Sequence, residues 1–174
     1  MNKKQSNGKG EFTISYEFNA PKELVFNAFA NAEALNEWWG PVETKNSVIH
    51  LDFKTGGIFH YKMESKGRTN FGRFLFGKIQ PHDYLEFTNS FSDEYANVIK
   101  APFDIPLPLE IFYRLSFTEN KGKTTINMTG LPTHANEDEQ KGFMSINASM
   151  QQGFGATFSQ LAAYLDKLQS KILD

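Results

Sequence analysis

The chain has 174 residues, the length of one domain, and its 18 Lys and Arg against 20 Asp and Glu give a net charge of −2. This balance offers no basic field for nucleic acid or anionic lipid, so we expect neither nucleic acid nor a membrane as a partner. The chain has no cysteine, which excludes a disulfide framework, a thiol nucleophile and a thiolate metal site. Seventeen Phe, six Tyr and two Trp indicate a core or a pocket built from aromatic rings.

The first ten residues are polar and contain no apolar run of the length that a signal peptide or an anchor requires. We expect a flexible tail at residues 1–10 and one domain at residues 11–170. With no cysteine and no such targeting run, the expected location is cytoplasmic.

The first expected elements are a strand and two short helices. Apolar and polar residues alternate over residues 12–18, the pattern of a half-buried strand. Pro21 favours the start of a helix, and a second helix is expected from Ala32. Trp38 and Trp39 end this second helix before a Gly-Pro stop, and adjacent helical positions face about 100° apart. One indole is therefore expected in the core, and the other could cover a cavity.

Six further strands are expected, at residues 48–53, 58–64, 71–79, 84–91, 110–118 and 123–131. Turn residues separate most of them. Residues 92–109 are different, because about eighteen residues with three prolines are too many for a plain connection in a compact domain. We expect this segment to act as a flap over a cavity mouth.

The last segment, residues 138–168, is predicted to be one continuous helix. It has no charge between Lys141 and Asp166, and its apolar residues recur at three- and four-residue spacing. Such a stripe needs a large apolar surface to pack against. The expected fold is therefore α+β, a curved antiparallel sheet of about seven strands around the C-terminal helix. Gly153 and Gly155 weaken a helix interior and indicate a close backbone approach or a kink, and the uncharged helix is compatible with a homodimer.

Four separated blocks carry a family resemblance, in this order along the chain: NAPKELVFNAFANAEALNEWWGP, LDFKTGGIFHYKM, SFSDEYANVIKAPF and SMQQGFGATFSQLAAYL. Together they resemble the Hsp90-ATPase-activator-homologue-1-like branch of the START-like (SRPBCC) superfamily. The resemblance implies a helix-grip fold, in which seven strands grip the C-terminal helix around an apolar cavity. One departure is Phe154, where this branch usually carries Trp, so the indole donor is missing at this position.

The favoured function is binding of a small apolar or aromatic molecule in that cavity, without a cofactor. Asn147 adds a polar group to the apolar stripe, and a buried amide needs a partner. The candidate ligand-binding residues are Trp38, Trp39, Phe59, Tyr61, Phe87, Phe103, Asn147, Met150, Phe154 and Phe158.

A second hypothesis is an enzyme of cyclase-like or hydrolytic type, since relatives in the superfamily act as cyclases on aromatic polyketides. It needs a titratable or polar group in the cavity, and the candidates are His134, as acid or base, and Asn147. His60 is expected to be structural, on the opposite sheet face from its apolar neighbours. No His pair has the spacing of a metal site, so no metal is expected.

A third hypothesis is a protein-interaction module, such as an activator of an Hsp90-type chaperone. In the two-domain co-chaperone that names the family, a separate N-terminal domain makes a principal contact with the chaperone. The ten polar residues before Glu11 cannot replace a folded module, so the sequence does not favour a chaperone partner. Under this hypothesis the outer surface of the long helix, with its uncharged Ser, Gln and Thr residues, would contact the partner.

Overall fold

The computed structural model describes residues 10–173. Its strands are β1 (Phe12–Phe18), β2 (Lys45–Leu51), β3 (Ile58–Ser65), β4 (Arg68–Gln80), β5 (Tyr84–Ser92), β6 (Glu110–Asn120) and β7 (Lys123–Thr133). Its helices are α1 (Lys22–Asn27), α2 (Ala32–Trp38), α3 (Glu137–Ser145) and α4 (Asn147–Leu173). All seven predicted strands are present. Residues 1–9 of the predicted flexible tail lie outside the described residues.

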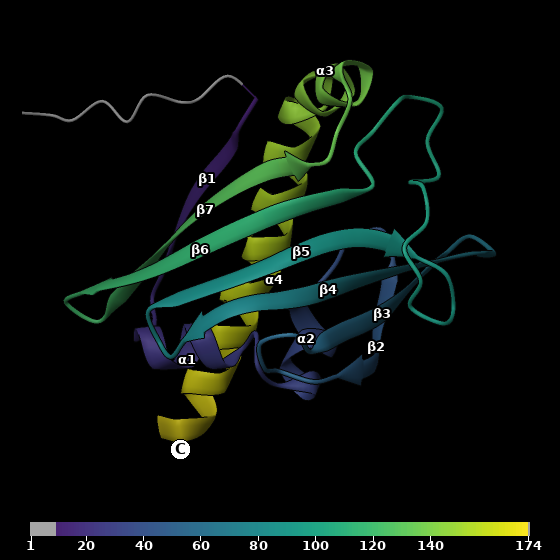
Figure 1. Cartoon of the computed structure of the whole chain (residues 1–174). Helices are drawn as coiled ribbons and strands as arrows, with labels where there is room; N and C mark the ends of the chain where they lie inside the picture. Colours follow the sequence, from purple (N-terminus) through teal and green to yellow (C-terminus); the bar gives the residue numbers. More distant parts are fainter. Residues whose placement is uncertain (1–9, 174) are drawn as a thin grey trace, which may run out of the picture.

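The seven strands form one antiparallel sheet in the order β1-β7-β6-β5-β4-β3-β2. The sheet curves, and α4 crosses behind it in Figure 1, with α1 and α2 at one end and α3 at the other. This arrangement confirms the predicted α+β helix-grip fold. Among residues 10–173, no helix is both long enough and apolar enough to cross a membrane.

The two faces of the sheet differ because side chains alternate along each strand. On β4, Phe74 and Phe76 are buried on the inner face, toward α4, whereas Leu75 between them is exposed. Phe74 stacks on Phe87 of the neighbouring strand, with ring centroids 3.9 Å apart. Aromatic rings therefore form much of the layer between the sheet and the helix.

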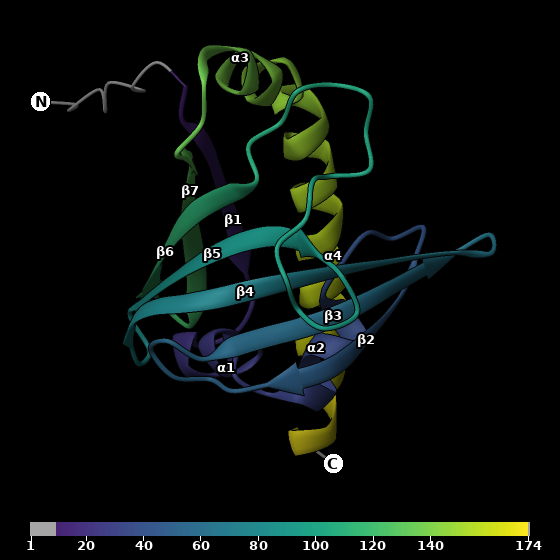
Figure 2. The same ribbon diagram turned by 45° about the vertical axis from the view of Figure 1, so that its right-hand side comes forward.

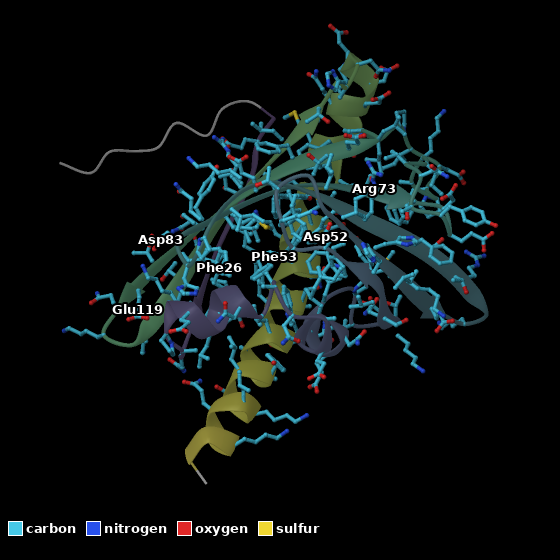
Figure 3. The ribbon with its side chains drawn as sticks, turned by 60° about the horizontal axis from the view of Figure 1, so that its bottom comes forward. Phe26, Asp52, Phe53, Arg73, Asp83 and Glu119 are labelled. Atoms are coloured by element: carbon cyan, nitrogen blue, oxygen red, sulfur yellow. The ribbon has the colours of Figure 1, made fainter. Side chains whose placement is uncertain are left out.

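The short helices α1 and α2 close the lower end of the sheet. The Asn31 side chain caps α2 by accepting a hydrogen bond from the Ala34 N–H at 3.1 Å. At the start of α1, the Lys22 backbone N–H donates to the Glu119 carboxylate at 2.7 Å, and the Lys22 ammonium pairs with Asp83. Figure 3 looks at this end and shows Asp83 and Glu119 on the side where α1 lies. These contacts attach α1 to the turns at this end of the sheet.

The prediction of one continuous helix over residues 138–168 is wrong. The helix is broken at Ile146 (φ −99°, ψ 11°), which separates α3 from α4. The structure gives a physical reason: α3 packs against the loop before β6, and a Cβ at Gly142 would collide with the Pro106 carbonyl oxygen. Phe143 of α3 is buried and belongs to the same hydrophobic core as the buried residues of α4. The break at Ile146 therefore lets α3 contact the loop while Phe143 stays in the core.

Neutral hydrogen bonds attach α4 to the rest of the chain, in addition to its buried apolar residues. Each of four uncharged side chains donates to a backbone carbonyl: Gln151 to Thr13 (2.5 Å), Thr157 to Gly40 (3.0 Å), Gln160 to Gly40 (3.0 Å) and Gln169 to Asn19 (2.9 Å). These side chains are thus engaged within the chain. The predicted close backbone approach or kink at Gly153 and Gly155 is absent. A Cβ at either position would meet nothing within 4 Å, and α4 continues through both.

The loop between β5 and β6 contacts both faces of the sheet. Its first part runs over β4 and β3 on the face away from α4, in front of the sheet in Figure 2. There His60 Nε2 donates to the Asp93 carbonyl (3.1 Å) and Arg73 donates to the Ala96 carbonyl (2.9 Å). His60 is therefore structural, as predicted. The second part of the loop returns to the inner side, where the Phe103 ring lies 5.9 Å from that of Phe91.

Candidate functional site

The two adjacent tryptophans point to different surroundings because the chain leaves the helix between them. Trp38 ends α2, and Trp39 already has extended backbone angles (φ −76°, ψ 138°). Trp38 is fully buried, and its indole N–H donates to the Ala28 carbonyl at 2.9 Å. Trp39 instead packs edge-on against Phe74, at 4.8 Å, and Tyr61, at 5.8 Å, on the inner face of the sheet. Of the two, Trp39 is the one that faces the space between sheet and helix.

The Trp39 indole N–H is the one buried side-chain polar atom of residues 10–173 without a hydrogen-bond partner. The Tyr61 hydroxyl is near enough for Trp39 to lower its pKa slightly, but the two groups do not meet the geometry of a hydrogen bond. Burying a donor without an acceptor costs about 1–3 kcal/mol, and such groups are rare in folded proteins. This N–H is therefore available to an acceptor that enters the interior.

Two tyrosines lie over glycines on the inner face. Tyr61 pairs with Gly72 across β3 and β4, and a Cβ on Gly72 would collide with the Tyr61 ring. Tyr113 pairs with Gly130 across β6 and β7, where a Cβ would come within 2.6 Å of the Tyr113 ring. Both rings can lie low on the sheet because these neighbours have no side chain. The two hydroxyls are thereby held within the interior.

Asn89 of β5 completes a polar group at this place. Its amide donates to the Tyr61 hydroxyl oxygen at 3.0 Å and to the Arg73 carbonyl at 3.1 Å. Burial raises the pKa of Tyr61 to about 12, against the smaller opposite effects of Asn89 and Trp39. Burial, together with the nearby Tyr61, also raises the pKa of Tyr113. Both phenols therefore stay protonated at neutral pH and remain hydrogen-bond donors.

Phe154 of α4 covers this group from the helix side. Its ring centroid lies 5.5 Å from that of Phe12, 5.6 Å from Tyr113 and 6.5 Å from Trp39. Phe154 is only partly buried, whereas the aromatic neighbours Phe12, Trp39 and Tyr113 are buried. We call the set Trp39, Tyr61, Asn89, Tyr113 and Phe154 the interior cluster. Two surface pockets, of about 320 and 240 Å³, lie outside it.

The structure places the other predicted site residues in three environments. Trp38, Phe59, Phe87 and Phe158 are fully buried in the aromatic core, and Met150 is partly buried against it. Phe103 is 58% exposed on the loop. Asn147 is the half-buried first residue of α4, at the helix break, and not a residue of a continuous buried stripe. The structure therefore brings Trp39, Tyr61 and Phe154 together and leaves Phe103 and Asn147 outside the interior cluster.

His134 lies outside the interior cluster. It is exposed, follows the end of β7 and has a left-handed backbone (φ 51°). The sequence reasoning also missed two members of the cluster, Asn89 and Tyr113. Asn89 could have been found, because it continues the alternation of Leu85 and Phe87 on the inner face. Tyr113 is a buried residue in an alternating strand, and no local signal marks it as more than core.

Comparison with known proteins places the fold in a family. The family model described as activator of Hsp90 ATPase homolog 1-like protein matches residues 19–166. No curated protein matches the sequence. A solved structure from Arthrobacter aurescens is similar, with 25% identity, a TM-score of 0.75 and coverage of 91% of this chain and 87% of that chain.

Two further solved structures show the same fold. One, from Mycobacterium smegmatis, has 23% identity and a TM-score of 0.72, covering 90% of this chain and 91% of that one. The other, from Staphylococcus epidermidis, has 21% identity and a TM-score of 0.73, covering 91% of each chain.

Proposed function

The chain belongs to the activator of Hsp90 ATPase homolog 1-like family, with a START-like helix-grip fold, and from this premise we propose that it binds a small, neutral, largely apolar molecule between sheet and helix. The ligand carries an oxygen that accepts a hydrogen bond from Trp39. Ligand sites commonly combine apolar walls with a few polar groups that fix orientation. The interior cluster has this composition.

The observation that carries the proposal is the unpartnered Trp39 N–H. An indole N–H can only donate, so its natural complement is an acceptor such as a carbonyl or ether oxygen. The protonated hydroxyls of Tyr61 and Tyr113 lie in the same cluster, and the Asn89 amide already donates to Tyr61. The cluster is therefore rich in donors, which favours a ligand with an acceptor over an amine.

The composition of the cluster also supports a neutral ligand. Its five side chains carry no formal charge at neutral pH, since the two phenols keep their protons. Burying a carboxylate or an ammonium there without an opposite charge would be strongly unfavourable. A ring system with one carbonyl group satisfies both the apolar walls and the donors.

Entry of such a ligand requires the Phe154 ring to move, because it fills the space above Tyr113 and Trp39. Two features favour this movement. Phe154 is partly exposed, and it is flanked by Gly153 and Gly155, whose Cβ positions have no neighbour within 4 Å. Glycine also weakens the local helix by about 1 kcal/mol per residue relative to Ala. We expect α4 to open at this turn when a ligand binds.

The test compares two ligands of matched shape, 2-acetylnaphthalene and 2-ethylnaphthalene, which differ by a carbonyl oxygen. Binding is followed by the resonance of the Trp39 indole N–H in the ¹⁵N-labelled protein, and native mass spectrometry gives the stoichiometry. We expect the ketone to bind more tightly by the value of one hydrogen bond, about 0.5–1.5 kcal/mol or roughly two- to tenfold. The Trp39→Phe variant should bind both ligands equally.

Trp38→Phe is the matched control, because its N–H donates to Ala28 and not to the interior. This variant should lose stability but still prefer the ketone. The proposal fails if neither naphthalene perturbs the Trp39 resonance, or if Trp39→Phe keeps the full preference for the ketone.

A further inference from the structure

A second candidate site lies beside the loop between β5 and β6, and no residue of the interior cluster lines it. The pocket of about 320 Å³ sits between the start of β4, the end of β5 and the first part of the loop. Its apolar walls are Phe71, Phe91, Ile99 and Pro102. This volume is at the lower end of the range of small-molecule sites, so it suits a ligand with a single ring or a short chain.

One wall of this pocket is formed by a turn at residues 93–97 that is held by hydrogen bonds. The Asp93 carboxylate accepts hydrogen bonds from the backbone N–H groups of Tyr95 (2.9 Å) and Asn97 (2.8 Å) and from the Asn97 side chain (2.9 Å). Behind the turn, His60 and Arg73 hold the carbonyls of Asp93 and Ala96. Figure 3 shows Arg73 on the side of the molecule opposite Asp83. The turn is therefore held in place before any ligand binds.

The charge of the lining has one sign. Asp93 and Glu94 are the charged residues that line the pocket, and both are acidic. Hydrogen bonds from Asn97 lower the pKa of Asp93, so this carboxylate is ionised at neutral pH. Glu94 is exposed and forms no ion pair within residues 10–173. Lys100 is also exposed but does not line the pocket.

From this combination we infer that the pocket binds a small organic cation, an ammonium or guanidinium group attached to a short apolar or aromatic portion. The cationic group lies against Asp93 and Glu94, and the apolar portion lies against Phe71 and Phe91, whose rings also attract a cation through their faces. This ligand is the opposite of the one proposed for the interior, which is neutral and accepts hydrogen bonds. The two sites therefore select different molecules.

The test is an NMR titration of the ¹⁵N-labelled protein with 2-phenylethylamine, 2-phenylethanol and 3-phenylpropionate, which carry similar rings and differ in charge. We expect saturable shifts for the amine at the amides of Asn70, Phe71, Glu94 and Ile99, with little change at the Trp39 indole. The alcohol should bind more weakly and the anion weakest. High salt should weaken binding of the amine, because the carboxylates are near the surface.

Glu94→Gln keeps the shape of the side chain and removes its charge. It should weaken amine binding about two- to fivefold, the usual value of one exposed ion pair, and leave binding of the alcohol unchanged. Glu23→Gln, an exposed substitution on α1 at the far end of the sheet, is the matched control and should have no effect.

Three results would each overturn the inference. The alcohol could bind as tightly as the amine, Glu94→Gln could leave the affinity for the amine unchanged, or the shifts could appear at Trp39 and not at the pocket. Because the readouts are separate resonances, failure here is distinguishable from failure of the interior site.

Discussion

Replacing the two glycines of α4 by alanine should make the protein more stable. Glycine in a helix interior costs about 0.8–1.0 kcal/mol relative to Ala. A Cβ at Gly153 or Gly155 would meet nothing within 4 Å, so no clash offsets this gain. The double variant should therefore gain about 2 kcal/mol, which corresponds to a rise in Tm of about 4–8 °C for a domain of this size.

The assay is thermal and urea unfolding followed by circular dichroism, with Gly142→Ala of α3 as the matched control. The control is the same chemical change in a helix, but its Cβ would collide with the Pro106 carbonyl oxygen. It should destabilise the protein, whereas Gly153→Ala and Gly155→Ala stabilise it. If all three variants shift the Tm in the same direction, reasoning from the free space at these positions is refuted.

The same double variant bears on function. If the turn around Phe154 opens to admit a ligand, a stiffer turn should slow association with 2-acetylnaphthalene while leaving the contacts at Trp39 in place. Stopped-flow measurement of the tryptophan signal would detect this change. An unchanged association rate in the stabilised variant would contradict opening at this turn.

Three further predictions concern single side chains. The free energy of unfolding should fall as pH rises from about 10 to about 12, because the folded state holds the Tyr61 proton more tightly than the unfolded state. Urea titrations of the Tyr61→Phe variant should lack this part of the loss. Thr157→Val removes a buried hydrogen bond to the Gly40 carbonyl and should cost about 1–2 kcal/mol in urea unfolding; no loss would show that the bond adds nothing to stability. Arg73→Met releases the Ala96 carbonyl and should speed hydrogen exchange in residues 93–99 about tenfold or more, whereas unchanged exchange would show that other contacts hold the turn.

The strands were predictable because each has one buried face. Residues 12–18 were predicted with the bounds that the structure has, since apolar and polar side chains alternate there without interruption. The break at Ile146 was not predictable in the same way. The apolar spacing continues from Phe143 into α4, and only the contact of Gly142 with Pro106, which are distant in sequence, turns α3 away.

The interior cluster was predicted in part for a similar reason. Trp39 and Phe154 stood out as large aromatic residues beside Gly and Pro, and Tyr61 lay on an apolar strand face. The role of Tyr113 depends on Gly130, its direct partner on the neighbouring strand β7. Strand pairing of this kind cannot be read from a single sequence. Loss of the helical backbone between the two tryptophans decides which indole faces the interior, and this too is a tertiary result.

The attachment of α4 has a consequence for the conditions under which the domain keeps its shape. Its four polar links to backbone carbonyls use amide and hydroxyl donors, and the ion pair that α4 makes within the described residues, Lys167 with Glu37 at 3.3 Å, is exposed. Neutral donors do not titrate, and dissolved ions screen them little compared with charged pairs. The attachment of α4 to the rest of the domain should therefore be nearly the same at low and at high salt concentration.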